Sequence, residues 1–294
     1  MTRERPIALV TGGNAGIGRE TCRGLLGAGF HVVLCARSQA KAEGAIGELL
    51  SGTSNGTAEA LVLDLASLTS VRTAAETFLA TGRALDVCVL NAGIMALPWK
   101  RTVDGFEQQW QVNVLGHFLL GRLLLPALQA APAARMVHLA SRAHMRHPQP
   151  IDYDQLKREH LSDDGFDRWR AYGRSKLANI LFSNELARRL SGSKVTSNAV
   201  HPGLVATELL TKAGGSLGRG IPVAEGARTS IYLATSPDVE GQTGGYYYQC
   251  APVAPGTRSR TSISASDDEA RTLWAVASEQ VGLSVDGAAD AGPA

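Results

Sequence analysis

The sequence predicts an α/β protein with a single doubly wound parallel sheet and helices on both faces. Short apolar runs, many rich in Val, alternate with longer helical stretches along most of the 294 residues. The runs are unbroken rather than alternating with polar residues, which is typical of parallel strands covered on both faces. No repeat or interdomain linker interrupts the pattern. We therefore expect one domain over residues 1–285 and a disordered tail over 286–294.

Six apolar runs are the expected strands. They are Ile7–Thr11, His31–Cys35, Ala60–Leu63, Val87–Leu90, Met136–Ala140 and Val195–Val200. The expected helices are Gly16–Gly29, Gln39–Leu50, Leu68–Thr81, Phe106–Ala131, Arg168–Leu190 and Ser266–Gln280, the last with three acidic residues in its first turn. Two longer stretches, Ser141–Asp167 and Leu209–Pro222, break the alternation, and we expect both to be binding loops.

Composition and charge argue against several classes of function. The 29 basic and 27 acidic residues leave a net charge of +2, which does not predict a nucleic-acid-binding protein. The four cysteines have neither zinc-ligand spacing nor the density of a disulfide framework, so a reducing compartment is expected. There is no signal-peptide pattern, and the most apolar window, Leu115–Ala134, contains His117, Arg122 and Pro126. We expect a cytoplasmic protein without a membrane span.

A glycine-rich segment follows the first expected strand and opens the first helix. It reads Thr-Gly-Gly-Asn-Ala-Gly-Ile-Gly over residues 11–18. Glycines at this junction allow a tight turn, and they let backbone amides and the helix N-terminus approach a pyrophosphate. The predicted contacts are Gly12, Asn14, Gly16, Ile17 and Gly18. A purely structural turn is the alternative.

The order of the motifs resembles the short-chain dehydrogenase/reductase family over about residues 6–250. The motifs are Thr-Gly-x-x-x-Gly-x-Gly, Asp64-Leu65, Asn91-Ala92-Gly93, Asn113, Ser141, Tyr172-x-x-x-Lys176 and His201-Pro202-Gly203. The resemblance implies a Rossmann-like fold that binds a nicotinamide cofactor. It places Asp64 and Leu65 beside the adenine and Asn91, Ala92 and Gly93 over the cofactor. Pro202, Gly203, Val205 and Thr207 would then lie near the nicotinamide carboxamide.

The end of the second strand predicts which cofactor is used. A site for NAD usually has an acidic residue there to hold the ribose 2′-hydroxyl. This chain instead reads Leu-Cys-Ala-Arg over residues 34–37. The Arg37 guanidinium could pair with a 2′-phosphate, so we expect NADP(H). A solvated Arg37 is the alternative.

Tyr172 and Lys176 are four residues apart on an expected helix and so share one face. A neighbouring ammonium would lower the pKa of the tyrosine and prepare it for proton transfer. Ser141 would hydrogen-bond the substrate oxygen. The resemblance implies that Asn113 completes the catalytic set by holding a water near Lys176. It also implies hydride transfer from NADPH to a carbonyl, with Tyr172 as the general acid.

The amino-acid sequence of residues 102–107 and 113–120 resembles one branch of the family, the retinol dehydrogenase-like and protochlorophyllide reductase-like enzymes. That resemblance implies a carbonyl reductase or alcohol dehydrogenase for a bulky hydrophobic substrate, such as a retinal-like compound or an aromatic polyketide ketone. A catalytically silent NADP-binding regulator is the alternative. The four intact catalytic residues argue against it.

We expect the loop over about residues 209–222 to form a lid on the substrate. Leu204, Leu209, Leu210 and Leu217 would form an apolar wall, with Met145 on the facing loop. The alternative is that these side chains pack only against the protein.

Two further expectations concern metals and assembly. The loop histidines His144, His147 and His160 lack a standard ligand spacing, so no metal is expected. The resemblance implies a homodimer paired through the helices over 106–131 and 168–190. A monomer is the alternative.

Overall fold

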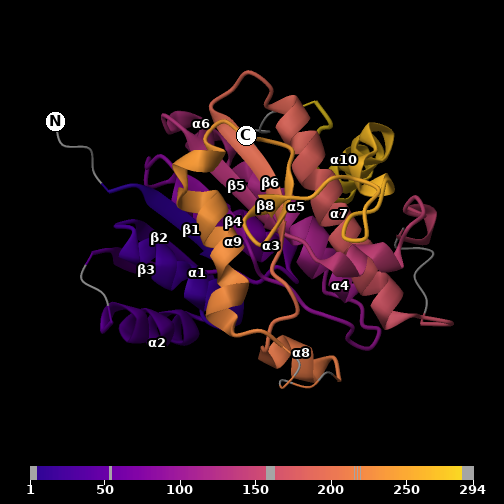
Figure 1. The fold of residues 1–294 in the computed structure, drawn as a ribbon, viewed down its shortest axis with the longest axis horizontal. Helices are drawn as coiled ribbons and strands as arrows, with labels where there is room; N and C mark the ends of the chain where they lie inside the picture. Colours follow the sequence, from indigo (N-terminus) through magenta and orange to yellow (C-terminus); the bar gives the residue numbers. More distant parts are fainter. Residues whose placement is uncertain are drawn as a thin grey trace.

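One sheet of eight strands forms the centre of the protein in a computed structural model (Figure 1). The structure describes residues 5–286 except 53–54, 157–162, 215, 217 and 219. The strand order is β3-β2-β1-β4-β5-β6-β7-β8, parallel except for β8, which pairs antiparallel with β7 at the edge. The strands are β1 (Ile7–Thr11), β2 (His31–Ala36), β3 (Thr57–Val62), β4 (Val87–Leu90), β5 (Ala134–Leu139), β6 (Val195–His201), β7 (Tyr246–Tyr248) and β8 (Ala251–Pro252).

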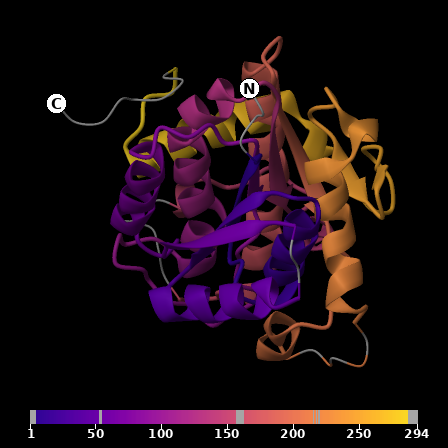
Figure 2. The same cartoon turned by 90° about the vertical axis from the view of Figure 1, so that its left-hand side faces the viewer.

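Helices cover both faces of the sheet, which confirms the doubly wound prediction. One face carries α1 (Gly16–Gly27), α2 (Gln39–Leu50) and α9 (Val223–Thr235). The other carries α3 (Leu68–Leu79), α5 (Gly116–Leu123), α6 (Leu125–Ala130), α7 (Arg168–Arg189) and α10 (Asp267–Val281). The described residues also include two short α-helices, α4 (Gln108–Trp110) and α8 (Glu208–Lys212). Figure 2 shows α8, in orange, standing out below the helix–sheet body.

The two larger hydrophobic cores lie on opposite sides of the sheet. Successive strand residues face opposite cores, so Leu9 belongs to one core and Ala8 and Val10 to the other. Both sides of each central strand are therefore buried, which explains the unbroken apolar runs. The order β3-β2-β1-β4 reverses direction between β1 and β4, and ligands of such sheets bind at this switch point.

The expected helix over Phe106–Ala131 is broken into four pieces. After α4, residues Gln111–Leu115 form a π-helical segment, and α5 and α6 follow with a break at Leu124. Pro126 lies in the first turn of α6, where its missing N–H costs no hydrogen bond. The π-helical segment contains Asn113, and such segments often occur at functional sites.

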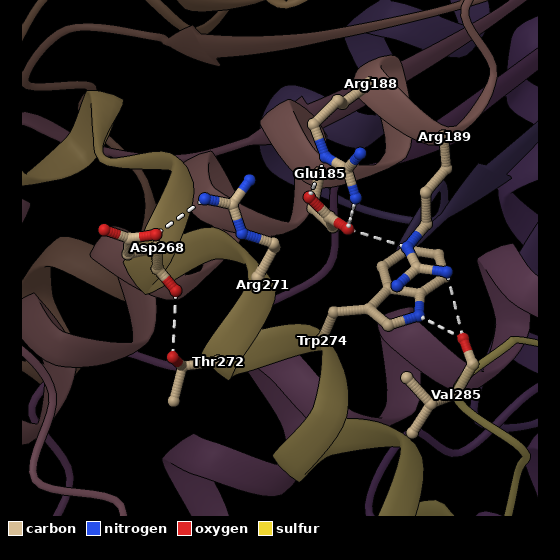
Figure 3. Close-up of polar contacts among 8 residues, drawn as sticks. All are labelled: Glu185, Arg188, Arg189, Asp268, Arg271, Thr272, Trp274 and Val285. Carbon is tan, nitrogen blue, oxygen red and sulfur yellow. Dashed lines mark hydrogen bonds and ion pairs between the residues drawn. The ribbon is translucent and has the colours of Figure 1, made fainter.

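The C-terminal helix α10 packs along α7 and also contacts α5. Its Trp274 is buried against Phe118 and Phe182, and the guanidinium carbons of Arg122 and Arg189 lie 4.6 and 4.4 Å from the Trp274 ring centre. Figure 3 shows Arg189 and the Trp274 indole both directed at the carbonyl oxygen of Val285. The helices expected to pair two subunits are thus covered in part by the chain's own C-terminal helix.

Candidate active site

The glycine segment between β1 and α1 has the geometry of an anion cradle. Gly12 and Gly16 have φ values of +66° and +54°, which L side chains rarely adopt. A Cβ on Gly18 would lie 2.3 Å from the carbonyl oxygen of Gly12, so the turn requires glycine there. The N-cap residue of α1 is Ala15, whose methyl group cannot cap the helix. The first-turn amides are therefore available to a pyrophosphate, and the loop fits a dinucleotide.

Hydrogen bonds fix the end of β1 to the loop after β4. The Thr11 hydroxyl oxygen accepts from the amides of Asn91 and Ala92, both at 2.9 Å. The Asn91 side-chain amide donates to the Thr11 carbonyl oxygen at 2.8 Å. These bonds hold Asn91, Ala92 and Gly93 at the switch point, beside the glycine segment.

Asn113 binds the same loop from the helix side. Its Oδ1 accepts from the Ile94 amide at 2.9 Å, and its Nδ2 donates to the Ile94 carbonyl and to Ser175 Oγ, both at 2.9 Å. Ser175 Oγ in turn donates to the Tyr172 carbonyl at 2.8 Å. The fully buried Asn113 amide therefore ties the loop after β4 to the first half of α7.

The structure brings Ser141, Tyr172 and Lys176 together. Ser141 follows β5 and forms a side-chain hydrogen bond with Tyr172. The Lys176 ammonium donates to the Leu139 carbonyl at 2.8 Å and lies 5.7 Å from the Tyr172 ring centre. A Cβ on Gly93 would lie 3.6 Å from Lys176 Nζ, at ordinary contact distance, and so Gly93 lies next to the lysine.

Burial dominates the titration of both groups on α7. It raises the pKa of Tyr172 to about 12, although the hydrogen bond from Ser141 acts in the opposite direction. Burial also lowers the pKa of Lys176 to about 7. The pKa of Tyr172 is raised, whereas a neighbouring ammonium alone would lower it. Burial removes stabilising water from the phenolate, and the neighbouring groups do not replace that stabilisation in full. Tyr172 is thus a protonated phenol at neutral pH, the form that a general acid requires.

One pocket connects these groups to the cofactor loop and to the predicted lid. Its lining includes 11 of the other predicted residues besides Lys176 and Tyr172: Ile17, Asn91, Gly93, Ser141, Pro202, Gly203, Leu204, Val205, Thr207, Leu209 and Leu210. It also includes Ile94 and Met95, which the sequence analysis missed. Their signal was present, because both directly follow the Asn-Ala-Gly motif. Met145 does not belong to this described lining, and Leu217 lies outside the described residues.

Three other predicted cofactor contacts lie at the ends of neighbouring strands. Arg37 is exposed directly after β2. Asp64 follows β3, and its carboxylate accepts from the Ala66 amide at 3.0 Å. Leu65 is buried, with its carbonyl oxygen 2.8 Å from where a Cβ on Gly116 would lie. Their roles toward a cofactor remain predictions.

The loop histidines do not form a metal site in the part of the chain that the structure describes. His144 Nδ1 donates to the Ser141 carbonyl at 2.7 Å, and its Nε2 accepts from the Thr261 amide. His147 is buried nearby in sequence, and His160 lies outside the described residues. On β5, His138 forms a 2.9 Å hydrogen bond with Ser197 Oγ and packs edge-on against Phe182.

Comparisons with known proteins agree with this geometry. The family model described as short chain dehydrogenase matches residues 6–153. Human retinol dehydrogenase 14 is 40% identical over 310 residues, covering 94% of this chain and 86% of its own. The chain belongs to the short-chain dehydrogenase family.

Within this family, the sequence relatives place the chain in the retinol dehydrogenase-like branch. The short-chain dehydrogenase also resembles a crystal structure of an uncharacterized protein from Mycobacterium paratuberculosis, with a TM-score of 0.75 and 33% identity over 97% and 96% of the two chains. A protein from Beutenbergia cavernae, described as an NAD(P)-dependent gluconate 5-dehydrogenase and solved with NADP at low occupancy, has a TM-score of 0.65 and 27% identity over 83% and 94%.

Among the helices that the structure describes, none has both the length and the apolar character of a membrane span.

Proposed function

We propose that this short-chain dehydrogenase is an NADP(H)-dependent carbonyl reductase or alcohol dehydrogenase for bulky hydrophobic substrates. The observation that carries the proposal is that one pocket is lined by Ile17 of the glycine segment, by Ser141, Tyr172 and Lys176, and by leucines of the predicted lid. A cofactor on the glycine segment and a carbonyl beside Tyr172 would therefore meet in one cavity.

The chain's own residues account for proton transfer and orientation. In reduction, the Tyr172 phenol donates its proton to the substrate oxygen, and in oxidation the phenolate takes a proton from the alcohol. Ser141 donates a hydrogen bond to the same oxygen and stabilises charge that develops on it. The Lys176 ammonium favours the tyrosinate after the proton has left. When bound, the nicotinamide supplies the hydride in reduction and accepts it in oxidation.

The choice of NADP(H) rests on Arg37. The residue is exposed directly after β2, where a carboxylate would otherwise select the ribose 2′-hydroxyl. Its guanidinium suits a 2′-phosphate, because two parallel N–H groups can bind two phosphate oxygens. The NADP present in the gluconate 5-dehydrogenase structure supports the same cofactor.

The choice of a hydrophobic substrate rests on the apolar side chains that line the pocket. Ile94, Met95, Leu204, Leu209 and Leu210 line it. Leu204 is 53% exposed although it is a large apolar residue, so a hydrophobic substrate would gain free energy by covering it. The retinol dehydrogenases among the relatives support a large apolar substrate.

A substrate series tests this proposal. NADPH oxidation should be measured with aliphatic and aromatic ketones and aldehydes of increasing size, including retinal, and with small polar ketones as the control. We expect kcat/KM to rise with apolar size, and Leu209→Ser to reduce that rise, because each buried methylene contributes about 0.8 kcal/mol. A preference for small polar ketones would contradict the substrate class. A chain that binds NADPH but reduces no carbonyl and oxidises no alcohol would contradict the enzymatic function.

A further inference from the structure

His117 is a buried histidine on α5, one helical turn after Asn113, with 2% of its surface exposed. Its Nε2 lies 2.8 Å from the hydroxyl oxygen of Thr11, the last residue of β1. Its Nδ1 lies 3.3 Å from the backbone carbonyl oxygen of Asn113 in the π-helical segment. The ring therefore spans the space between the end of β1 and a predicted catalytic residue.

The hydrogen bonds around Thr11 determine which nitrogen of His117 carries the proton. The Thr11 hydroxyl oxygen already accepts from two amides, those of Asn91 and Ala92, which use both of its lone pairs. Its proton must then point to His117 Nε2, which accepts. The ring proton is left on Nδ1 and is donated to the Asn113 carbonyl. The four groups form one directed chain from the loop after β4 to the π-helical segment.

The ring keeps this arrangement at every pH used for assays. Burial, assisted by the charge of Lys176, lowers the pKa of His117 to about 3. A proton on Nε2 would face a hydroxyl oxygen with no free lone pair, which disfavours the charged form further. His117 is therefore a neutral donor and acceptor of fixed direction.

The position of Asn113 determines the positions of several other groups. Its side chain holds the Ile94 backbone through two bonds and reaches Ser175 on α7. Its Oδ1 also lies 3.2 Å from where a Cβ on Gly93 would stand, so the two are in close contact. A small displacement of Asn113 would move the loop beside Lys176, and misplacement of reacting groups by about 1 Å can cost on the order of 100-fold in rate.

We propose that His117 is a positioning residue, which aligns the Asn113 backbone with the cofactor loop through Thr11. The inference rests on the proposed reductase function, because the family resemblance implies that Asn113 belongs to the catalytic set of such an enzyme. His117 touches neither substrate nor cofactor in this account. It acts through its two hydrogen-bond partners.

Two substitutions distinguish the effects of the two hydrogen bonds that His117 makes, one with Thr11 and one with the Asn113 carbonyl. His117→Gln can place its amide oxygen where Nε2 lies, which keeps the acceptor for Thr11 and removes the donor to Asn113. His117→Phe removes both. We expect His117→Gln to lower kcat about tenfold with KM for NADPH within about twofold of wild type, because only the alignment of Asn113 is lost. His117→Phe should lower kcat at least as far and also raise KM and Kd for NADPH, because the loop over the cofactor loosens.

His138→Gln is the matched control. His138 is also 2% exposed, and burial lowers its pKa to about 3, but its Nε2 bonds to Ser197 rather than to the site. Its substitution should lower the melting temperature and leave kcat unchanged. The concentration of active sites should be determined by fluorescence titration with NADPH, so that kcat is calculated only for folded protein that binds the cofactor. Should His117→Phe not fold, His117→Asn can place its amide nitrogen where Nδ1 lies, which keeps the donor to Asn113 and removes the acceptor for Thr11, and it should likewise raise Kd for NADPH.

The outcomes separate this inference from the proposed function. Wild-type kcat and KM in a folded His117→Gln, with unchanged NADPH affinity in His117→Phe or His117→Asn, would overturn the positioning role. An effect of His138→Gln on kcat as large as that of His117→Gln would do the same. If wild type bound NADPH without turnover, the proposed function would fail, and the Kd values of His117→Phe and His117→Asn would still decide whether His117 aligns the loop.

Discussion

The ammonium nitrogen of Lys176 lies 5.7 Å from the centre of the Tyr172 ring, one turn away on α7. Both side chains are buried, at 3% and 6% exposure. Burial lowers the pKa of Lys176 and raises the pKa of Tyr172, which favours the neutral form of each. Two groups that would catalyse proton transfer are therefore held in a site that disfavours their charges. Such a site is expected to cost the protein stability in exchange for activity.

Lys176→Met should stabilise the protein while abolishing turnover. Burial lowers the pKa of Lys176 from 10.5 to about 7, so between these pH values the unfolded chain binds more protons than the folded one. Wild-type stability should therefore rise with pH across that window, because the penalty is complete below pH 7 and is lost toward pH 10.5. The increase in the free energy of unfolding from Lys176→Met should be on the order of 1 kcal/mol or more below pH 7, and it should vanish as the pH approaches 10.5.

Urea unfolding of the cofactor-free protein at several pH values measures this gain. The Leu139 carbonyl that Lys176 leaves is still bonded by Asn179 Nδ2 at 3.2 Å, so the substitution does not orphan it. Lys194→Met, at an exposed position, is the control and should change little at any pH. A gain from Lys176→Met that does not depend on pH, or a loss of stability, would contradict the assignment of the penalty to the buried ammonium.

Arg37→Gln should reduce the preference for NADPH. We expect wild type to favour NADPH over NADH by at least about tenfold in kcat/KM, and the variant to lose most of that margin through KM for NADPH. Steady-state kinetics with both cofactors provide the measurement. Arg271→Gln on α10, whose guanidinium pairs with Asp268 far along the chain, is the matched control (Figure 3). A wild-type preference for NADH would refute the inference that Arg37 selects NADP(H).

The protein should be a monomer in dilute solution. Dimer formation through α5 and α7 was expected, but α10 packs along α7 and buries Trp274 against Phe118. The apolar residues Leu115, Leu119 and Leu120 lie in the core rather than on a free face. Light scattering should therefore give the chain mass of 31.0 kDa. Twice that mass at micromolar concentration would show pairing through a different surface or around α10.

The sequence predicted what depends on local patterns. The bounds of β1, β4 and α2 are those predicted, because unbroken apolar runs and a capping serine mark them. β7 and β8 were missed. A run of three tyrosines directly after two glycines resembles a turn, and only pairing with β6 makes it a strand.

The remaining differences depend on tertiary contacts. The π-helical segment at Asn113 is stabilised by bonds to Ile94 and His117, which no helical pattern contains. The position of Met95 in the pocket and of Met145 outside its lining depends on how two loops fold over the sheet edge. The pKa of Tyr172 could not be predicted from Lys176 alone, because burial of both groups determines it.

Turnover by Tyr172→Phe tests the central claim most directly. The variant keeps the ring and removes only the hydroxyl, so the pocket and the cofactor loop should be unchanged. NADPH oxidation with the best bulky ketone or aldehyde should be measured alongside NADPH affinity by fluorescence. The account predicts that affinity stays within about twofold while kcat falls by about 10²–10⁴-fold, the contribution of a positioned general acid. Near-wild-type kcat in a folded Tyr172→Phe that binds NADPH normally would contradict it.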